Sequence, residues 1–470
     1  MPIMDSRISI APPHAQQGAA ALIMMIIVVV GASYYFLGAL NRASSQVERD
    51  RITVAALAQA KEALIGYAAS VTVTASSGLC GANCPRPGDL PCPDTNNDGE
   101  AESSCGNAAG TTGQEKRLGR LPWKTLGLPD LRDGYGERLW YAVSNNFKNN
   151  FRAPQLNSDT FGTITVRSST GTMLNNGTDS SATIAVILSS GSVLMRQDAR
   201  QQDRSCSRGG VPDPVCQASE VCTTPNPTTT AKCNPTNYLD ILKDIEDNAD
   251  FADGNTNGFI NGEVLDANRN PIVNDKLITV AYGDLMPLLE KRVAGEALSC
   301  LTEYATRPQN QGHYPWAATL DTSVPPDYND DSGALFGRLP DAPFINTRAD
   351  SGDGMDNNWT GTCNINPASG WWPNWKEMVF YAVANACKPM AAAGCSGTFL
   401  TVTPPPSAPD PQVVVIVAGR RLAGVAGGQP RGTSAEKGTT ANYLEGNNQS
   451  GIAFQQGKAT STFNDSLGYR

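Results

Sequence analysis

Histidine is nearly absent from the 470-residue chain, and basic residues are outnumbered by acidic ones. There are two histidines, and 36 Lys and Arg face 45 Asp and Glu, which gives a formal net charge of -9. Nucleic-acid binding requires a basic footprint, which is lacking. His313 is the one histidine beyond residue 14, and the motifs HExxH, GxSxG and GxxxxGK[ST] do not occur. We therefore expect a protein that is not an enzyme and does not bind nucleic acid.

Aromatic and charged residues are also scarce, at 7% and 17%, whereas 45 Gly, 32 Pro and 12 Cys are present. This composition predicts β-rich structure with long loops. No CxxC pair occurs, and zinc sites favour such pairs or Cys/His mixtures. We expect disulfides formed in an oxidising compartment, with the local pairs Cys92–Cys105 and Cys387–Cys395 as candidates.

Residues 19–40 form an apolar run of 22 residues without a charge. As a helix the run is about 33 Å long, which predicts a transmembrane helix. A buried core helix and a cleaved signal peptide are the alternatives. All the cysteines follow the run, which places the C-terminal side outside the cytosol. Helical spacing of apolar residues continues over 41–69, so one helix of about fifty residues is expected from Ala19.

A polar leader over residues 1–18 ends in Gly18, and the apolar run and its amphipathic continuation follow. This arrangement resembles the type IV pilin and type II secretion pseudopilin superfamily. The resemblance is to its minor, large-headed members that lack the Glu usual at the fifth mature position, which is Ile23 here. It implies cleavage between Gly18 and Ala19 and methylation of Ala19. It also implies a single-pass inner-membrane protein with a periplasmic or extracellular C-terminal region.

The region beyond residue 70 contains the same series of short motifs twice, in the same order. The matched segments are Gly119–Pro122 with Gly337–Pro340, Tyr141–Asn145 with Tyr381–Asn385, Ala182–Leu188 with Val413–Ala418, Asn237–Asp240 with Asn442–Glu445, and Asn274-Asp275 with Asn464-Asp465. The order predicts a duplication, with a first unit over 41–283 and a second over 284–470. The second opens on a helix over 284–305 with Asp284 as its N-cap.

The expected fold class is α+β: a long N-terminal transmembrane helix followed by two tandem pilin-like units. Each unit is expected to pack a helix on a small antiparallel sheet, with long loops held by disulfides. A cluster of tryptophans at Trp371, Trp372 and Trp375 is assigned to the core rather than to a binding surface.

Two loops place oxygen ligands at alternate positions, which is the pattern that Ca²⁺ favours. The candidate ligands are Asp94, Asn96, Asp98 and Glu100 in the first loop, and Asp253, Asn255, Asn257 and Glu263 in the second. Such Asp/Asn/Gly stretches also form plain turns. Calcium is the one cofactor that the sequence suggests.

The function expected from the resemblance is a non-enzymatic, membrane-anchored minor pilin or pseudopilin of a type IV pilus or type II secretion machine. Its partners would be the membrane, other pilin-like subunits and assembly proteins of that machine. The rival hypothesis is a single-span inner-membrane protein whose duplicated periplasmic region binds a ligand or partner outside any filament.

Overall fold

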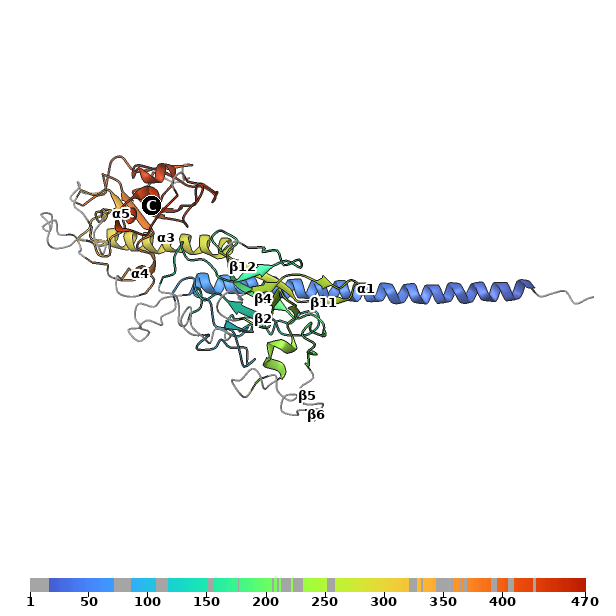
Figure 1. The fold of residues 1–470 in the computed structure, drawn as a ribbon. Coiled ribbons are helices and arrows are strands. Elements are labelled where there is room, and N and C mark those ends of the chain that lie inside the picture. Colours follow the sequence, from blue (N-terminus) through green and yellow to red (C-terminus); the bar gives the residue numbers. More distant parts are fainter. Residues whose placement is uncertain are drawn as a thin grey trace, which may run out of the picture.

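The computed structural model describes much of the chain, and its remaining segments are not discussed. Outside the described part lie residues 1–16, 72–85, 107–116, 150–154, 176, 205–206, 209–210, 213–220, 223–230, 252–257, 321–327, 331–332, 344–354, 356–357, 360, 364, 367–369, 390–394, 405–409 and 426–427, and most side chains of 17–43. The described part contains one long helix and two four-stranded sheets, with a second helix between them (Figure 1).

Helix α1 runs from Gln17 to Ser70, and its N-terminal part projects well beyond the rest of the molecule (Figure 1). Its C-terminal part packs through one face, because buried residues recur there at helical spacing. These buried apolar residues are Ala56, Leu57, Ala60, Leu64, Ile65 and Ala68. Alanines on this face let the first sheet approach the helix closely.

The expectation of a membrane span is contradicted. No helix in the described part of the chain is both long and apolar enough to cross a membrane. Where its side chains are described continuously, from Ser44 onward, α1 carries a run of charges over 48–51, and α3 carries another over 290–292. The predicted transmembrane helix over 19–40 and the single-pass inner-membrane location are therefore both wrong.

The first unit contains a sheet of order β1-β2-β4-β12, antiparallel throughout. Its strands are β1 (Leu118–Arg120), β2 (Trp140–Val143), β4 (Thr183–Ser189) and β12 (Lys276–Ala281). Both faces of β4 are covered, and all seven of its residues are buried. A continuous β-branched and aliphatic run is what a central strand buried on both sides requires.

The second unit contains a sheet of order β13-β14-β16-β18, again antiparallel. Its strands are β13 (Phe336–Arg338), β14 (Val379–Val383), β16 (Val413–Val417) and β18 (Ser466–Tyr469). The register is the same in the two sheets: Gly119 pairs with Tyr141 as Gly337 pairs with Tyr381. Segments with matching sequence motifs thus occupy equivalent strands.

Each unit has more than the single sheet that was expected, because its loops form short ladders of their own. In unit 1, β3 (Thr165–Arg167) pairs in parallel with β9 (Gly258–Ile260), and in unit 2, β15 (Thr401–Thr403) pairs in parallel with β17 (Ala453–Gln455). The other ladders, all antiparallel and in unit 1, join β5 (Ser207–Arg208) to β6 (Val211–Pro212), β7 (Ile241–Leu242) to β8 (Glu246–Asp247), and β10 (Val264–Leu265) to β11 (Pro271–Val273).

Helix α3 spans Tyr282–Thr306 and follows β12 without a loop. Asp284 is therefore not the N-cap that was predicted but lies one turn further in, where its carboxylate accepts the backbone N–H of Ala281 at 2.8 Å. The same carboxylate receives the ammonium of Lys61 from α1 at 2.8 Å. The two long helices are thus joined at the point where unit 1 ends and unit 2 begins.

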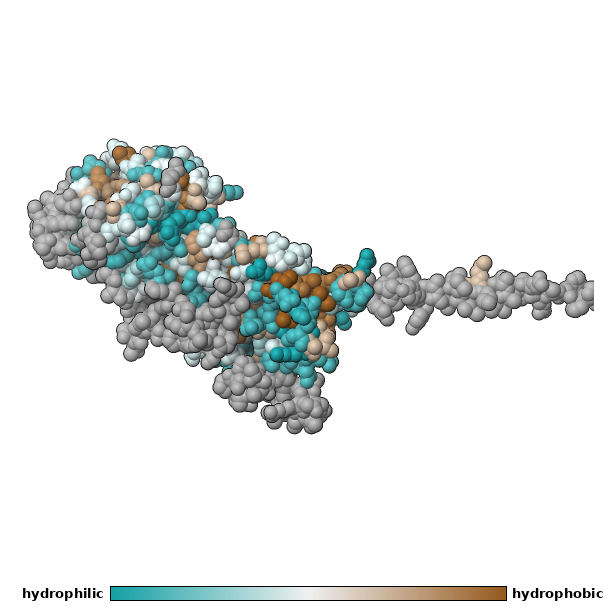
Figure 2. Space-filling model, viewed as in Figure 1, coloured by the Kyte–Doolittle hydropathy of each residue, from teal (hydrophilic) through white to brown (hydrophobic). Residues whose placement is uncertain are grey.

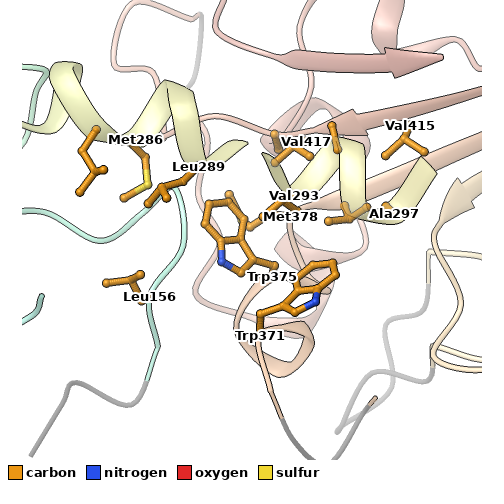
Figure 3. Packing of buried hydrophobic residues seen from close by; sticks show 14 of the residues in the cluster. Leu156, Met286, Leu289, Val293, Ala297, Trp371, Trp375, Met378, Val415 and Val417 are labelled. Atoms are coloured by element: carbon orange, nitrogen blue, oxygen red, sulfur yellow. The ribbon is translucent and has the colours of Figure 1, made fainter. Parts of the chain in front are cut away.

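The largest hydrophobic cluster is continuous across the two units, and two smaller clusters lie within unit 1. Figure 3 shows Leu156 of unit 1 lying near Met286 and Leu289 of α3, with the second unit's tryptophans beyond them. Trp372, in the short helix α4 (Trp372–Trp375), is fully buried, and Trp371 and Trp375 are nearly so. Their assignment to the core is confirmed.

Four disulfides join cysteines in the described residues. They are Cys92–Cys105, Cys222–Cys233, Cys300–Cys363 and Cys387–Cys395, so both candidate local pairs are present. Cys80, Cys84, Cys206 and Cys216 lie outside the described part. The Cys300–Cys363 bond fastens α3 to a distant loop of its own unit.

Candidate functional site

A buried network of hydrogen bonds closes unit 1 beside β12. Gln202 donates from its side chain to the carboxylate of Asp240 at 2.8 Å, and the backbone N–H of Asp240 donates to Asp275 at 2.7 Å. Asn248 donates to the same Asp275 oxygen at 2.9 Å and accepts the backbone N–H of Ile260 at 2.7 Å. The network therefore ties three loop residues and the end of β9 to the start of β12.

Unit 2 contains the same network with equivalent residues. Gln429 donates to Glu445 at 2.6 Å, and the backbone N–H of Glu445 donates to Asp465 at 3.0 Å. Asn448 donates to Asp465 at 2.8 Å and accepts the backbone N–H of Gln455 at 2.7 Å. The repeated Asn-Asp and Tyr-Leu-Asp/Glu motifs therefore supply the acids of the same hydrogen-bond network in both units.

Burial dominates the protonation of these acids. Removal from water raises the pKa of Asp240 to about 6 and raises the pKa of Asp275 well above its usual range, where the Asp240 charge adds to the effect. In unit 2, burial and then the charge of Glu445 raise the pKa of Asp465 well above its usual range. Burial therefore favours the protonated form of Asp240, Asp275 and Asp465.

A perturbed carboxyl pair can indicate catalysis, but here it has a structural explanation. Most of its oxygens accept backbone N–H or side-chain amide groups, and the whole network occurs in both units. Features common to both units serve the common fold. Features found in one unit alone are therefore the better candidates for function.

A second shared feature is an aromatic ring contacted by two guanidinium groups. Arg120 and Arg204 lie 4.1 and 4.9 Å from the ring centre of Tyr238. In unit 2, Arg338 and Arg431 lie 4.2 and 4.3 Å from that of Tyr443. Sequence reasoning noted the repeated Gly-Arg-Leu-Pro motif but missed the second arginine, whose signal is a Gln-x-Arg motif in each unit.

The loop over 94–99 belongs to unit 1 alone. Asp94 forms a bridge with Arg120 of β1, and in unit 2 the residue that makes the equivalent bridge, with Arg338, is Ala318. Asp94 is 1% exposed, and burial raises its pKa to about 6. The candidate carboxylate thus has no counterpart in the second unit.

The candidate ligands of this loop accept its own backbone N–H groups. Asp94 accepts from Gly99 at 2.7 Å, Asn96 accepts from Asp98 at 2.9 Å, and Asp98 accepts from Glu100 at 2.8 Å. Gly99 has a φ of 90°, and a Cβ there would lie 2.6 Å from the Trp123 ring, so glycine is required. The structure brings Asp94, Asn96 and Asp98 into one tight turn.

A complete cation cage is not visible in this turn. The side chain of Glu100 is exposed, and Cys105, at the twelfth position where a calcium loop has a bidentate Glu, is bonded to Cys92. Among the described residues no group of three or more His, Cys, Asp or Glu side chains could hold a metal ion. A carboxylate has further lone pairs beyond those used here, so calcium binding at this loop stays a prediction.

The other predicted sites are described only in part. Asp253, Asn255 and Asn257 of the second candidate loop lie outside the described residues, and Glu263 is exposed. Gly18 and Ala19, the predicted processing residues, lie in the first turn of α1. Comparison of the chain with known protein families, curated proteins and solved structures finds no match.

Proposed function

We propose that the chain is a non-enzymatic, pilin-like subunit of a filament of the type IV pilus or type II secretion class. The single observation that carries this proposal is the geometry of α1. The helix has 54 residues, which corresponds to about 80 Å, and only its C-terminal part packs against unit 1. The N-terminal part extends away from both units (Figure 1).

Three exposed apolar side chains on one side of α1, together called the stripe below, support assembly with other helices. Met25 is 69% exposed, Val47 68% and Val54 61%. At 3.6 residues per turn these three lie within about 40° of one another around the helix. Figure 2 also shows apolar side chains gathered on unit 1 over β10 and β11, near the point where the helix leaves it. In this proposal α1 helices of other subunits cover the stripe.

The tandem units suggest a minor or tip component rather than the repeating subunit. A head of two units is difficult to place at every position of a tightly wound filament. A non-enzymatic role agrees with the surroundings of His313, which is buried and has its Nδ1 3.1 Å from the carbonyl oxygen of Asn310.

The decisive experiment determines the mature N-terminus in cells that contain a prepilin peptidase. Mass spectrometry is expected to find N-methyl-Ala19 as the first residue. An intact leader in such cells would overturn the proposal and leave the rival, a duplicated ligand- or partner-binding region outside any filament.

A second experiment tests the stripe itself. Val47→Asp combined with Val54→Asp is expected to abolish cross-linking between copies or to companion subunits while leaving the heads folded. Ser45→Asp is the matched control, because Ser45 is exposed on the same turn and lies about 160° around the helix from Val47. Equal effects of both variants would contradict a role for the stripe.

A further inference from the structure

A cavity of about 230 Å³ lies in unit 1, beside the loop over 94–99 and strand β1. Much of its wall is apolar and comes from Leu118, Trp140, Pro235, Ala249 and Phe251. An apolar cavity of about 150 Å³ is large enough to hold benzene. The cavity in unit 1 therefore has room for one aromatic ring and a substituent. Among its described lining residues none belongs to α1, so the cavity is independent of the assembly proposed above.

In unit 2 the equivalent place holds an aromatic side chain of the chain itself. Phe336 of β13 stands at the register position of Leu118 in β1, and Phe380 of β14 stands at that of Trp140 in β2. The rings of Phe336 and Phe380 are stacked, with 6.3 Å between their centres. Unit 2 thus covers this position of its sheet with a ring that its own sequence supplies.

Unit 1 has a leucine where unit 2 has this ring. In the described part of the chain Trp140 has one aromatic neighbour, Tyr238, at 5.5 Å between ring centres. The same contact exists in unit 2, so it belongs to the common fold. Phe251, which also lines the cavity, has its ring 5.3 Å from that of Phe259. The ring that unit 2 adds to Phe380 therefore has no counterpart on Trp140.

The polar groups in the cavity favour a ligand that donates a hydrogen bond. Asp250 is exposed, and its carboxylate forms no hydrogen bond or ion pair with a described residue. Glu102 accepts the Thr95 hydroxyl at 2.7 Å through one of its two oxygens, which leaves the other free. The guanidinium of Arg120 is engaged by two backbone carbonyls, at 2.7 and 3.1 Å. Free carboxylate oxygens attract a donor and repel an anion.

Trp140 adds a hydrogen-bond donor of its own. Its side chain is 1% exposed, and its indole N–H has no acceptor among the described residues. Phe380 has no such group, so the fold that the two units share does not require it. A buried donor without an acceptor costs free energy, which a hydrogen bond to a ligand oxygen offsets.

We propose that the cavity of unit 1 binds a small uncharged phenol, with its ring beside Trp140 and Phe251. The ring of the ligand takes the part that Phe336 plays in unit 2. A phenolic hydroxyl both donates and accepts a hydrogen bond, so it suits a site that combines free carboxylate oxygens with an indole N–H. An aromatic carboxylate is excluded, because its charge would face Asp250 and Glu102.

The test measures binding of phenol to the full chain by calorimetry, with a chelator present so that divalent cations at the loop over 94–99 play no part. Phenol is expected to bind with one site per chain. Toluene has the same ring without the hydroxyl and should bind at least tenfold more weakly, and benzoate should not bind. Absence of phenol binding, or equal binding of toluene, would overturn the proposal.

Three variants locate the site. Leu118→Phe introduces the ring found in unit 2 and is expected to abolish phenol binding. Trp140→Phe keeps a ring but removes the N–H, and should weaken binding at least fivefold. Leu265→Phe is the matched control, because it makes the first change at an exposed position of β10 outside the cavity, and should leave binding unchanged.

Melting curves of the variants show whether each one is folded. Unchanged phenol binding in folded Leu118→Phe or Trp140→Phe would contradict a site in this cavity. An equal loss of binding in Leu265→Phe would contradict it as well.

Discussion

Asp275 accepts the backbone N–H of Asp240 at 2.7 Å, and both carboxyl groups are buried within one hydrogen-bond network. Asp465 and Glu445 repeat this relationship in the second unit. In each pair, one residue lies in a loop and the other directly precedes the last strand of its unit, which is β12 in unit 1 and β18 in unit 2. Each unit of the duplicated fold therefore contains a pair of neighbouring buried acids.

We predict that stability falls as pH rises from about 4 to neutrality on account of these pairs. The folded state has the raised pKa values, so it binds more protons than the unfolded state and loses about 1.4 kcal/mol per pH unit for each proton retained. Asp275→Asn, which cannot ionise, should flatten this dependence. The charges that face the unit 1 pair are Arg196 and Arg204.

Urea denaturation of the wild type and of Asp275→Asn at pH 5, 6 and 7 measures this effect. Asp465→Asn is the matched variant in unit 2 and should flatten the slope by a similar amount. An unchanged slope in both variants would mean that the pairs are ionised when folded.

The sequence predicted which residues are repeated but not what they do. Asn274-Asp275 and Asn464-Asp465 were recognised as a repeat because each stands two residues before a leucine and the matched segments follow the same order. Their partners Gln202 and Gln429 were missed, because the flanking residues differ and only one Gln and one Arg are common to the two segments. Long-range pairing of buried polar groups leaves little trace in local sequence.

Local reasoning also failed where one element runs directly into the next. Asp284 has the chemistry of an N-cap, but β12 continues to Ala281 and leaves no room for a cap at that position. The transmembrane assignment rested on counting apolar residues over 19–40, whereas no helix among the described residues is long and apolar enough to cross a membrane. The two helices and their apolar faces could be predicted from the sequence, because helical periodicity is visible within a short segment.

We predict that Ca²⁺ raises the melting temperature of the wild type. By mass action, a ligand at one hundred times its dissociation constant adds about 2.7 kcal/mol. Asp98→Asn keeps an oxygen that can accept the Glu100 N–H but removes a charge from the first loop, so the effect should be lost. Asp410→Asn, which removes an exposed charge outside both candidate loops, is the control. Identical melting curves with calcium and with chelator would exclude binding.

We predict that the Cys300–Cys363 disulfide stabilises the protein more than Cys387–Cys395. The bonds close loops of 63 and 8 residues. The chain-entropy relation then gives losses of about 4 and about 2.5 kcal/mol on replacing both cysteines by alanine. Denaturant unfolding of the two double variants measures both values. A larger loss for the shorter loop would indicate that packing, rather than chain entropy, determines the contribution.

The contact between the units depends on Asn374, and we predict that Asn374→Ala uncouples their unfolding. Its side-chain oxygen accepts Arg86 at 2.9 Å and the backbone N–H of Leu156 at 3.1 Å, and all three groups are buried. Losing this acceptor removes two buried hydrogen bonds, at a cost of about 1 kcal/mol or more each. Calorimetry should then show two transitions instead of one.

Lys61→Met is the control, because it removes a partly exposed ion pair between the same units. It should cost about 1 kcal/mol or less and retain one transition. A single transition in Asn374→Ala would show that the shared apolar core alone couples the units.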